Sequence, residues 1–332
     1  MLLEQAGHQV RPVLKRQVTS FLKQVQGQAG YHLGWQDETG KPCAVSSGKA
    51  VRPALALAAA KAVGGRSQDA LPAAGAVQMV HDFSLLHDDI IDGDRTRRHR
   101  PAVWSVFGIP DGILTGDALL ALAFATLTEG PPETAPDALR CLADAVTELV
   151  EGEALDVAFE QRRHVSLNEY GAMAGAKTGA LMACACTLGA LAGGAGGERA
   201  QLLGAFGRHV GIAFQIVDDL LGLRGDPAVT GKPVGADLAS GKKTMPLLAA
   251  LGSGTRQGQE LAALLAGKAT LDRQALTRAA LLVEEAGGVS TARRFVHREL
   301  VAAFAALAEA VPAEGDREEL RALAHVLTHR SH

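Results

Sequence analysis

Apolar residues recur at three- and four-residue spacing along most of the chain, and no other feature of the sequence limits the fold as strongly. The spacing is clear at 51–63, "VRPALALAAAKAV", and at 138–160, "ALRCLADAVTELVEGEALDVAFE". Such periodicity places apolar side chains on one face of a helix, whereas a half-buried strand would alternate them. Aromatic residues make up only 4% of the chain and alanine is abundant, which favours helices packed closely through small side chains. The sequence therefore predicts an all-α fold.

Clusters of glycine and proline divide the chain into segments of ordinary helical length. They fall at 108–112, 129–137, 193–198, 225–237 and 251–259. None of them is long or biased enough in composition to separate two domains, and the sequence contains no internal repeat. We therefore predict one domain over residues 1–332, built as a bundle of about a dozen helices.

Charge and hydropathy indicate a cytoplasmic protein. The net charge of −3 does not favour binding to nucleic acid or to an anionic membrane. The first residues, "MLLEQAGHQV", lack the order of a signal peptide. Residues 178–197 are uncharged and long enough to span a membrane, but they are rich in Ala and Gly and end in "GGAGG", so we predict a buried helix instead. The cysteines lack paired zinc spacing and are expected to be reduced; they are Cys43, Cys141, Cys184 and Cys186.

Residues 85–104, "LLHDDIIDGDRTRRHRPAVW", crowd acidic and basic side chains together. On a helix, Asp88 and Asp92 lie one turn apart on the same face, and Asp89 flanks that face. Their repulsion could be offset by the arginines that follow, by a metal ion, or by a ligand that carries both metal and anion; a solvated acidic face is the simplest alternative. Carboxylates at this spacing suit Mg²⁺, which binds one or two carboxylates together with phosphate oxygens.

A second acidic pair strengthens the metal interpretation. Asp218 and Asp219 lie in another apolar stretch, "FQIVDDLL" (214–221). Two carboxylate clusters that face each other across a helical cavity would form a cage for metal ions. Basic residues near these motifs and near glycine-rich loops then favour a diphosphate ligand. These basic residues are Lys49, Arg52, Arg97, Arg98, Lys177, Lys232, Lys242 and Lys243.

In this combination and order, the motifs resemble those of the all-trans polyprenyl (isoprenyl) diphosphate synthases. The resemblance runs from "SSGKAVRP" (46–53) through "SLLHDDIIDGD" (84–94) and "FQIVDDLL" to "GADLASGKKTMP" (235–246). It implies an isoprenoid synthase-like fold with a deep central cavity, and a homodimer. It also implies Mg²⁺-dependent, head-to-tail condensation of isopentenyl diphosphate with dimethylallyl, geranyl or farnesyl diphosphate, with release of diphosphate.

The resemblance implies a role for each matched residue. The ligands of about three Mg²⁺ ions, for which Mn²⁺ can substitute, would be Asp88, Asp89, Asp92, Asp218 and Asp219. The residues around the allylic diphosphate would be Arg97, Lys177, Lys232 and Lys242. The residues that bind the diphosphate of isopentenyl diphosphate would be Lys49, Arg52, His81 and Arg98. The residues that face the reacting carbon chain, where a carbocation forms, would be Thr178 and Gln215.

Product length is also implied by the resemblance. An aromatic residue five positions before an uninterrupted D-D-x-x-D is typical of short-chain synthases, and Phe83 occupies that position. We predict that Phe83 closes the floor of the product channel, that the small Ser84 leaves it open, and that geranylgeranyl diphosphate is the main product, with farnesyl diphosphate second. Phe83 lies about 140° from Asp88 on an ideal helical wheel, so an ordinary core position is the alternative.

Three positions depart from the family pattern, and these departures would affect the affinity for metal ions and for the second substrate. Gly222 stands where the second motif normally ends in Asp, His99 stands at a usual Gly, and Ala50 at a usual Arg. A class I terpene synthase and a catalytically poor partner subunit of a heteromeric synthase are therefore alternative hypotheses. The intact first motif and the complete set of isopentenyl diphosphate positions favour the chain-elongating synthase over both.

Overall fold

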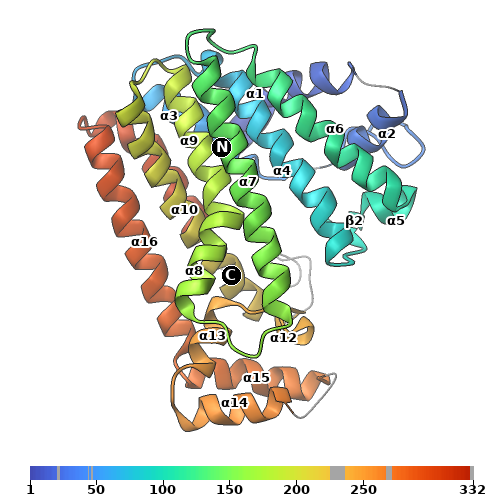
Figure 1. Ribbon diagram of the computed structural model, residues 1–332, viewed down its shortest axis with the longest axis vertical. Coiled ribbons are helices and arrows are strands. Elements are labelled where there is room, and N and C mark those ends of the chain that lie inside the picture. Colours follow the sequence, from blue (N-terminus) through green and yellow to red (C-terminus); the bar gives the residue numbers. More distant parts are fainter. Residues whose placement is uncertain (21–22, 44, 46–47, 225–235, 267–270, 330–332) are drawn as a thin grey trace. The chain divides into compact units, whose positions relative to one another are not determined.

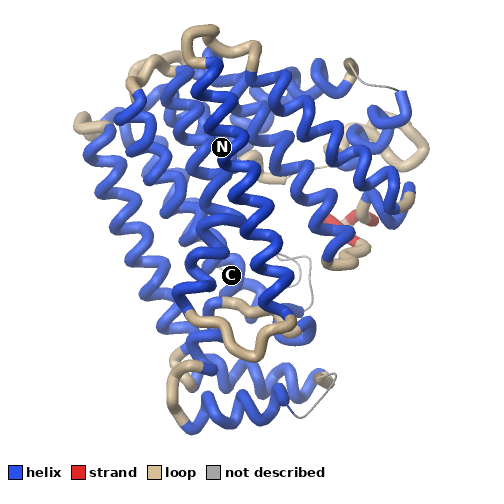
Figure 2. Tube along the Cα trace, in the orientation of Figure 1, coloured by secondary structure: helices blue, strands red, loops and turns tan. Residues whose placement is uncertain are grey.

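The computed structural model describes residues 1–332 apart from 21–22, 44, 46–47, 225–235, 267–270 and 330–332 (Figure 1). Figure 2 shows that helices make up nearly all of the described chain and that strand is confined to one small hairpin. The all-α prediction is confirmed. The helices are α1 (Leu2–Val18), α2 (Lys23–His32), α3 (Val51–Ala62), α4 (Leu71–Ile91), α5 (Val103–Phe107), α6 (Ile109–Leu127), α7 (Ala135–Glu160), α8 (Leu167–Ala174), α9 (Ala180–Ala192), α10 (Gly197–Arg224), α12 (Ala236–Ser240), α13 (Met245–Leu251), α14 (Arg256–Ala266), α15 (Arg273–Glu285), α16 (Gly288–Ala310) and α17 (Glu318–Thr328).

Two compact units can be distinguished in the chain, and each is described by itself. The first comprises Met1–Val146, Leu181–Gly204 and Leu307–Leu323. The second comprises Thr147–Ala180, Ala205–Ala306 and Ala324–His332. Their boundaries fall inside helices and not at the glycine and proline clusters, so the predicted loops separate helices but do not mark these units. The prediction of one domain over the whole chain stays a prediction.

Helices α4 and α6 pack closely in the first unit, and this contact positions the first acidic motif. Gly112 and Gly116 lie on the face of α6 toward α4. A Cβ atom on Gly116 would lie only 2.4 Å from His87 Nε2, and one on Gly112 would lie 2.9 Å from Ile90 Cδ1. The two glycines therefore allow α6 to approach the last turns of α4, where the aspartates follow.

A short antiparallel hairpin follows α4 and carries the arginines. Strands β1 (Thr96–Arg97) and β2 (Arg100–Pro101) pair with Arg97 opposite Arg100. The two loop residues, Arg98 and His99, have φ values of 54° and 62°, and two-residue hairpin loops commonly need positive φ at both positions. This explains why glycine is usual at position 99 in the family pattern. The hairpin is tied to α2 because the Tyr31 hydroxyl donates to the Pro101 carbonyl at 2.9 Å.

Two apolar clusters can be identified among the described residues of the second unit. One groups Phe159, Tyr170, Ile216 and Met245 around α8 and α10, and the other lies around α13, α14 and α15. Figure 1 shows α14 and α15 side by side. The first cluster surrounds the second acidic motif, so the aspartates of α10 emerge from a well-packed core.

A π-helical turn, Gly175–Gly179, joins α8 to α9 in one continuous helix. The N–H of Ala180 donates to the carbonyl of Gly175, five residues earlier. Gly152 of α7 lies directly against this turn, because a Cβ there would be 2.2 Å from the Lys177 nitrogen. Such turns are rare and occur frequently at functional sites.

Among the described residues, two helices are long and apolar enough to cross a membrane, judged by length and composition. In the helix Leu167–Ala192, 78% of the most apolar 18-residue stretch is buried inside the protein. This confirms the predicted buried helix around 178–197. The other, Ile109–Leu127, has 39% buried. Its exposed side includes Ile113 and Leu114, while its glycine face packs on α4.

The hairpin loop yields a prediction about stability. A residue with a Cβ atom is strained at positive φ, whereas glycine is not. We expect His99→Gly to raise the free energy of unfolding by about 0.5–1 kcal/mol, after the greater chain entropy of glycine is subtracted. Urea denaturation measures the change. The control His99→Ala keeps the Cβ and should give no gain; a less stable glycine variant would contradict the assignment of strain.

Candidate active site

The aspartates of the first motif stand at the end of α4 in two different environments. Oxygen atoms of Asp88 and Asp92 lie within 4.8 Å of each other. The side chain of Asp88 is 18% exposed and Asp92 is exposed, so both can reach a ligand. Asp89 is buried, and Arg97 Nε donates to its Oδ1 at 2.8 Å. Burial raises the pKa of Asp89, and the adjacent Arg97 opposes that rise. Of the three aspartates of this motif, Asp88 and Asp92 are therefore the two suited to hold a metal ion directly.

The hairpin directs its two adjacent arginines to different groups. Arg97 also donates to Asp88 Oδ2 at 3.2 Å, so it belongs to the acidic motif. Arg98 instead lies beside Gly48, where an added Cβ would be 3.0 Å from its Nη2 atom. Gly48 immediately precedes Lys49, so Arg98 meets the segment that leads into α3 at this point.

A cationic group forms around His81 in the first unit. Burial and then the positive charge of Arg52 lower the pKa of His81 well below its usual value, and Arg98 also contributes. The imidazole is therefore neutral at pH 7. Lys49 lies two residues before α3 and Arg52 lies in its first turn, after Ala50, which has a left-handed φ of 47°. The structure thus brings together Arg52, His81 and Arg98, three of the four residues assigned to the second substrate.

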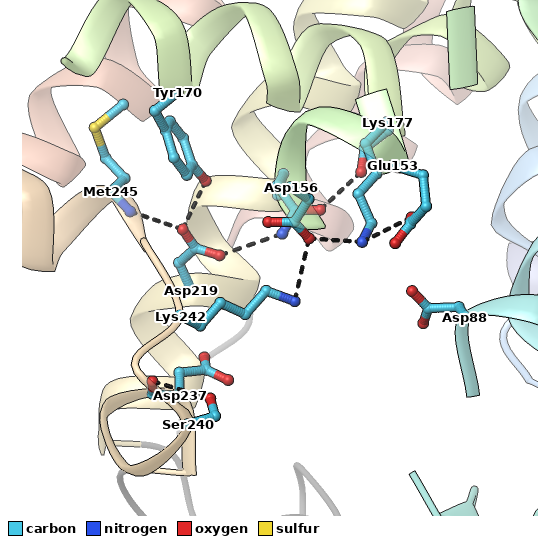
Figure 3. Close-up of polar contacts among 12 residues, drawn as sticks. Asp88, Glu153, Asp156, Tyr170, Lys177, Asp219, Asp237, Ser240, Lys242 and Met245 are labelled. Carbon is cyan, nitrogen blue, oxygen red and sulfur yellow. Dashed lines mark hydrogen bonds and ion pairs between the residues drawn. The ribbon is translucent and has the colours of Figure 1, made fainter. Parts of the chain in front are cut away.

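Two lysines share one carboxylate in the second unit (Figure 3). Lys177 Nζ donates to Asp156 Oδ2 at 2.7 Å and lies 2.8 Å from Glu153 Oε2. Lys242 Nζ lies 3.5 Å from the same oxygen of Asp156. Sequence reasoning selected both lysines but missed both acids. The available signal was the i, i+3 spacing in "EGEALDVAFE", which puts Glu153 and Asp156 on one face of α7.

The second acidic motif ends a chain of hydrogen bonds. Thr178 Oγ1 donates to Gln215 Oε1 at 2.7 Å, and Gln215 Nε2 donates to Asp219 Oδ1 at 3.2 Å. The other oxygen of Asp219 accepts from the Tyr170 hydroxyl at 2.6 Å and from the Met245 N–H at 2.9 Å (Figure 3). Burial raises the pKa of Asp219 to about 7, against the effect of these donors. Asp219 is enclosed, whereas Asp218 is only half-buried and is better placed for a ligand.

The space beside Gly222 is filled by a carboxylate from another helix. A Cβ on Gly222 would lie 2.2 Å from Oδ2 of Asp237, which belongs to α12 (Figure 3). The acid that the family pattern places at 222 is absent, and Asp237 supplies a carboxylate at that point. Sequence reasoning did not anticipate this neighbour because the two residues meet only in the folded chain.

The remaining predicted residues are placed as follows. Phe83 is buried, and its ring packs edge-on against His87 with centroids 4.8 Å apart. Ser84 is half-buried and donates to the His81 carbonyl at 2.8 Å. Lys232 lies outside the described residues. The roles assigned to all of these residues stay predictions.

Each unit therefore places carboxylates beside lysine or arginine on an all-helical scaffold, the arrangement expected of proteins that bind anions together with metal ions. The sequence pattern of the polyprenyl synthetase family matches residues 35–282. The chain belongs to this family, as the resemblance implied, and it is a trans-prenyltransferase.

Individual relatives agree with that assignment over nearly the whole chain. It is 46% identical over 311 residues to the geranylgeranyl diphosphate synthase of Mycobacterium tuberculosis. The aligned residues cover 93% of this chain and 89% of that protein. It is 41% identical over 324 residues to the (2E,6E)-farnesyl diphosphate synthase of Mycobacterium bovis, covering 97% and 90%. The crystal structure of a polyprenyl synthetase from Streptomyces coelicolor A3(2) matches with a TM-score of 0.93 and 42% identity, covering 98% of each chain. The isoprenoid synthase-like fold is confirmed by this match.

Relocation of one carboxylate provides a test of the Gly222 site. If Asp237 replaces the missing motif acid, Asp237→Ala should raise the Mg²⁺ concentration for half-maximal activity about tenfold, because a charged oxygen close to the metal is lost. The double variant Gly222→Asp/Asp237→Ala should restore most of this loss, since the carboxylate returns from the other side. Mg²⁺-induced thermal shifts give a second readout.

Ser240→Ala, on the same short helix α12, is the matched control and should leave the Mg²⁺ dependence unchanged. An unaltered Mg²⁺ requirement in Asp237→Ala, or no recovery in the double variant, would show that Asp237 only fills space beside Gly222.

Proposed function

We propose that this chain condenses isopentenyl diphosphate with an allylic diphosphate and makes geranylgeranyl diphosphate as its main product, with farnesyl diphosphate second. The observation that carries the proposal is the divergence of two neighbouring arginines. Arg97 joins Asp88 and Asp89, while Arg98 joins the group around His81. One anion site thus has carboxylates that a metal ion can reach, whereas the carboxylate beside the other, Asp82, is fully buried. That difference suits a metal-bound allylic diphosphate next to a metal-free isopentenyl diphosphate.

The donor set of the first site fits Mg²⁺. It offers only carboxylate oxygens, which this hard cation prefers, and Asp88 and Asp92 are close together and accessible. Asp88, Asp92 and Asp218 would hold the ions, about three in number, with Asp89 and Asp219 in support. Mn²⁺ would substitute, because it takes similar oxygen ligands. When bound, Mg²⁺ would neutralise charge that develops on the departing diphosphate.

The protein's own cations would orient the allylic substrate. Lys177 and Lys242 are held by Asp156, and Arg97 by Asp88 and Asp89, so each is already directed before an anion arrives. Lys232 would help to close over this diphosphate. The allylic C–O bond then breaks, and the diphosphate leaves with the electron pair. An apolar, water-poor cavity is needed here, because water would capture the allylic cation.

The second substrate would complete the reaction at the group formed by Lys49, Arg52, His81 and Arg98. The double bond of isopentenyl diphosphate attacks the cation and forms the new C–C bond, and a proton passes to the departed diphosphate. Gln215 is fixed between Thr178 and Asp219, so its amide presents a constant dipole to the reacting carbon chain. The cations of this group favour a synthase over a terpene synthase, which has no second diphosphate to bind.

We further propose a cytoplasmic homodimer. The support is the apolar side of α6, where Ile109, Ile113 and Leu114 are 48%, 40% and 58% exposed. The opposite side of α6 is occupied by its packing on α4, so a second copy of the chain would cover the exposed side. Light scattering on the purified protein would measure the mass, and a monomer at micromolar concentration would oppose the proposal.

Metal removal tests the proposed chemistry directly. EDTA should abolish the condensation of isopentenyl diphosphate with farnesyl diphosphate, and added Mg²⁺ should restore it. Asp88→Asn should lower kcat about a hundredfold or more with the fold intact, because stabilisation of transition-state charge is lost. Asp316→Asn changes an exposed surface residue and serves as control. Full turnover in EDTA would exclude the metal-dependent mechanism.

Product length is tested at Phe83. Removal of its buried ring in Phe83→Ala should open the floor of the channel and shift products beyond geranylgeranyl diphosphate, as measured by chromatography of the dephosphorylated products. Phe206→Ala removes another buried ring, from α10, and should lower stability without lengthening the product. Identical products from Phe83→Ala and the parent enzyme would instead make Phe83 an ordinary core residue.

A further inference from the structure

We propose that Asp82 is a positioning residue that holds Arg98 in place for the diphosphate of isopentenyl diphosphate. The inference rests on the proposed function, since it concerns how that substrate is bound. Asp82 touches none of the reacting groups in the mechanism above. It is, however, fully buried beside a residue assigned to the second substrate, and a buried carboxylate is costly unless its partners compensate.

Three side chains from three parts of the chain surround the Asp82 carboxylate. Gln78, one turn earlier on α4, donates from Nε2 to Oδ2 at 2.8 Å. His32, the last residue of α2, has Nε2 at 3.1 Å from Oδ1, and Arg98 Nη2 lies 3.6 Å from the same oxygen. These groups connect α2, α4 and the hairpin loop, and the Asp82 carboxylate is the point at which they meet.

The carboxylate stays ionised in this environment. Burial raises its pKa, but the hydrogen bond and charge of His32, followed by the charge of Arg98, lower the pKa of Asp82 to about 2 overall. An ionised carboxylate only accepts hydrogen bonds, so His32 Nε2 carries the proton and donates. Asp82 therefore presents a fixed negative charge to Arg98 across the working pH range.

Arg98 needs such an anchor because of its position. It lies in a two-residue loop with φ of 54°, a strained conformation that persists only where surrounding contacts enforce it. Its guanidinium sits between Asp82 and the backbone at Gly48, where a side chain at 48 would collide with it. Its buried Nη1 atom has no hydrogen-bond partner among the described residues. One side of the guanidinium thus faces Asp82, and Nη1 is a buried donor that an anion bound beside it would satisfy.

The experiment compares the two substrates in steady-state kinetics. Asp82→Asn keeps the shape of the side chain and removes its charge. We expect the KM for isopentenyl diphosphate to rise about tenfold, as befits a misaligned charged hydrogen-bond donor. The KM for farnesyl diphosphate should stay within about twofold, because Arg97 and the lysines do not depend on Asp82.

A matched control separates positioning from general stability. Glu299 is also a buried carboxylate paired to a histidine, with His209 Nδ1 at 2.7 Å, and it lies on α16, a helix that carries no residue assigned to a substrate. Glu299→Gln should lower thermal stability and leave both KM values unchanged. If Asp82→Asn does not fold, His32→Gln, which weakens the hold on Asp82, should still raise the KM for isopentenyl diphosphate selectively.

A double-mutant cycle with Arg98→Ala decides whether Asp82 acts through Arg98. In the Arg98→Ala background, Asp82→Asn should no longer change the KM for isopentenyl diphosphate. Equal rises for both substrates, or the same rise with and without Arg98, would overturn the positioning role. A parent enzyme that does not consume isopentenyl diphosphate at all would refute the proposed function instead, so the two failures are distinguishable.

Discussion

The basic side chains of the site are held by carboxylates before any ligand binds, and the other features of the site depend on this pairing. Asp89 holds Arg97, Asp82 holds Arg98, and Asp156 holds both Lys177 and Lys242. Isolated charges in such half-buried places would be destabilising. Because the pairs already exist, an incoming diphosphate exchanges one set of partners for another and does not have to order flexible side chains first.

Close approach of helices makes these pairs possible. Because Gly152 has no side chain, the π-helical turn that carries Lys177 can pack directly against α7. Gly116 likewise leaves space for the side chain of His87, which immediately precedes Asp88. A larger side chain at either position would force the helices apart and move the charged groups by more than a hydrogen bond tolerates. The abundance of alanine and glycine thus matters at the site as much as in the core.

Local patterns predicted much of the fold and of the site. The three- and four-residue spacing predicted helices, and the small-residue character of 178–197 predicted a buried one. The hairpin was not predicted, because strands of two residues are too short to show alternation. Glu153, Asp156 and Asp237 were missed for another reason: their partners lie on other helices, and only folding brings them together. Asp82 is similar, since His32 lies 50 residues earlier in the sequence.

The π-helical turn has a consequence for how the chain tolerates change. In Gly175–Gly179 the backbone fits an extra residue into one turn, as the five-residue bond from Ala180 to Gly175 shows. A one-residue deletion there would restore regular α-helix and leave the flanking parts of the helix in nearly the same orientation, but the residues of the turn itself would be redistributed around the helix axis. Lys177 and Thr178 would then no longer both face Asp156 and Gln215. The number of residues in this segment is therefore constrained, and not only their identities. A single-codon deletion here would do more harm than most substitutions.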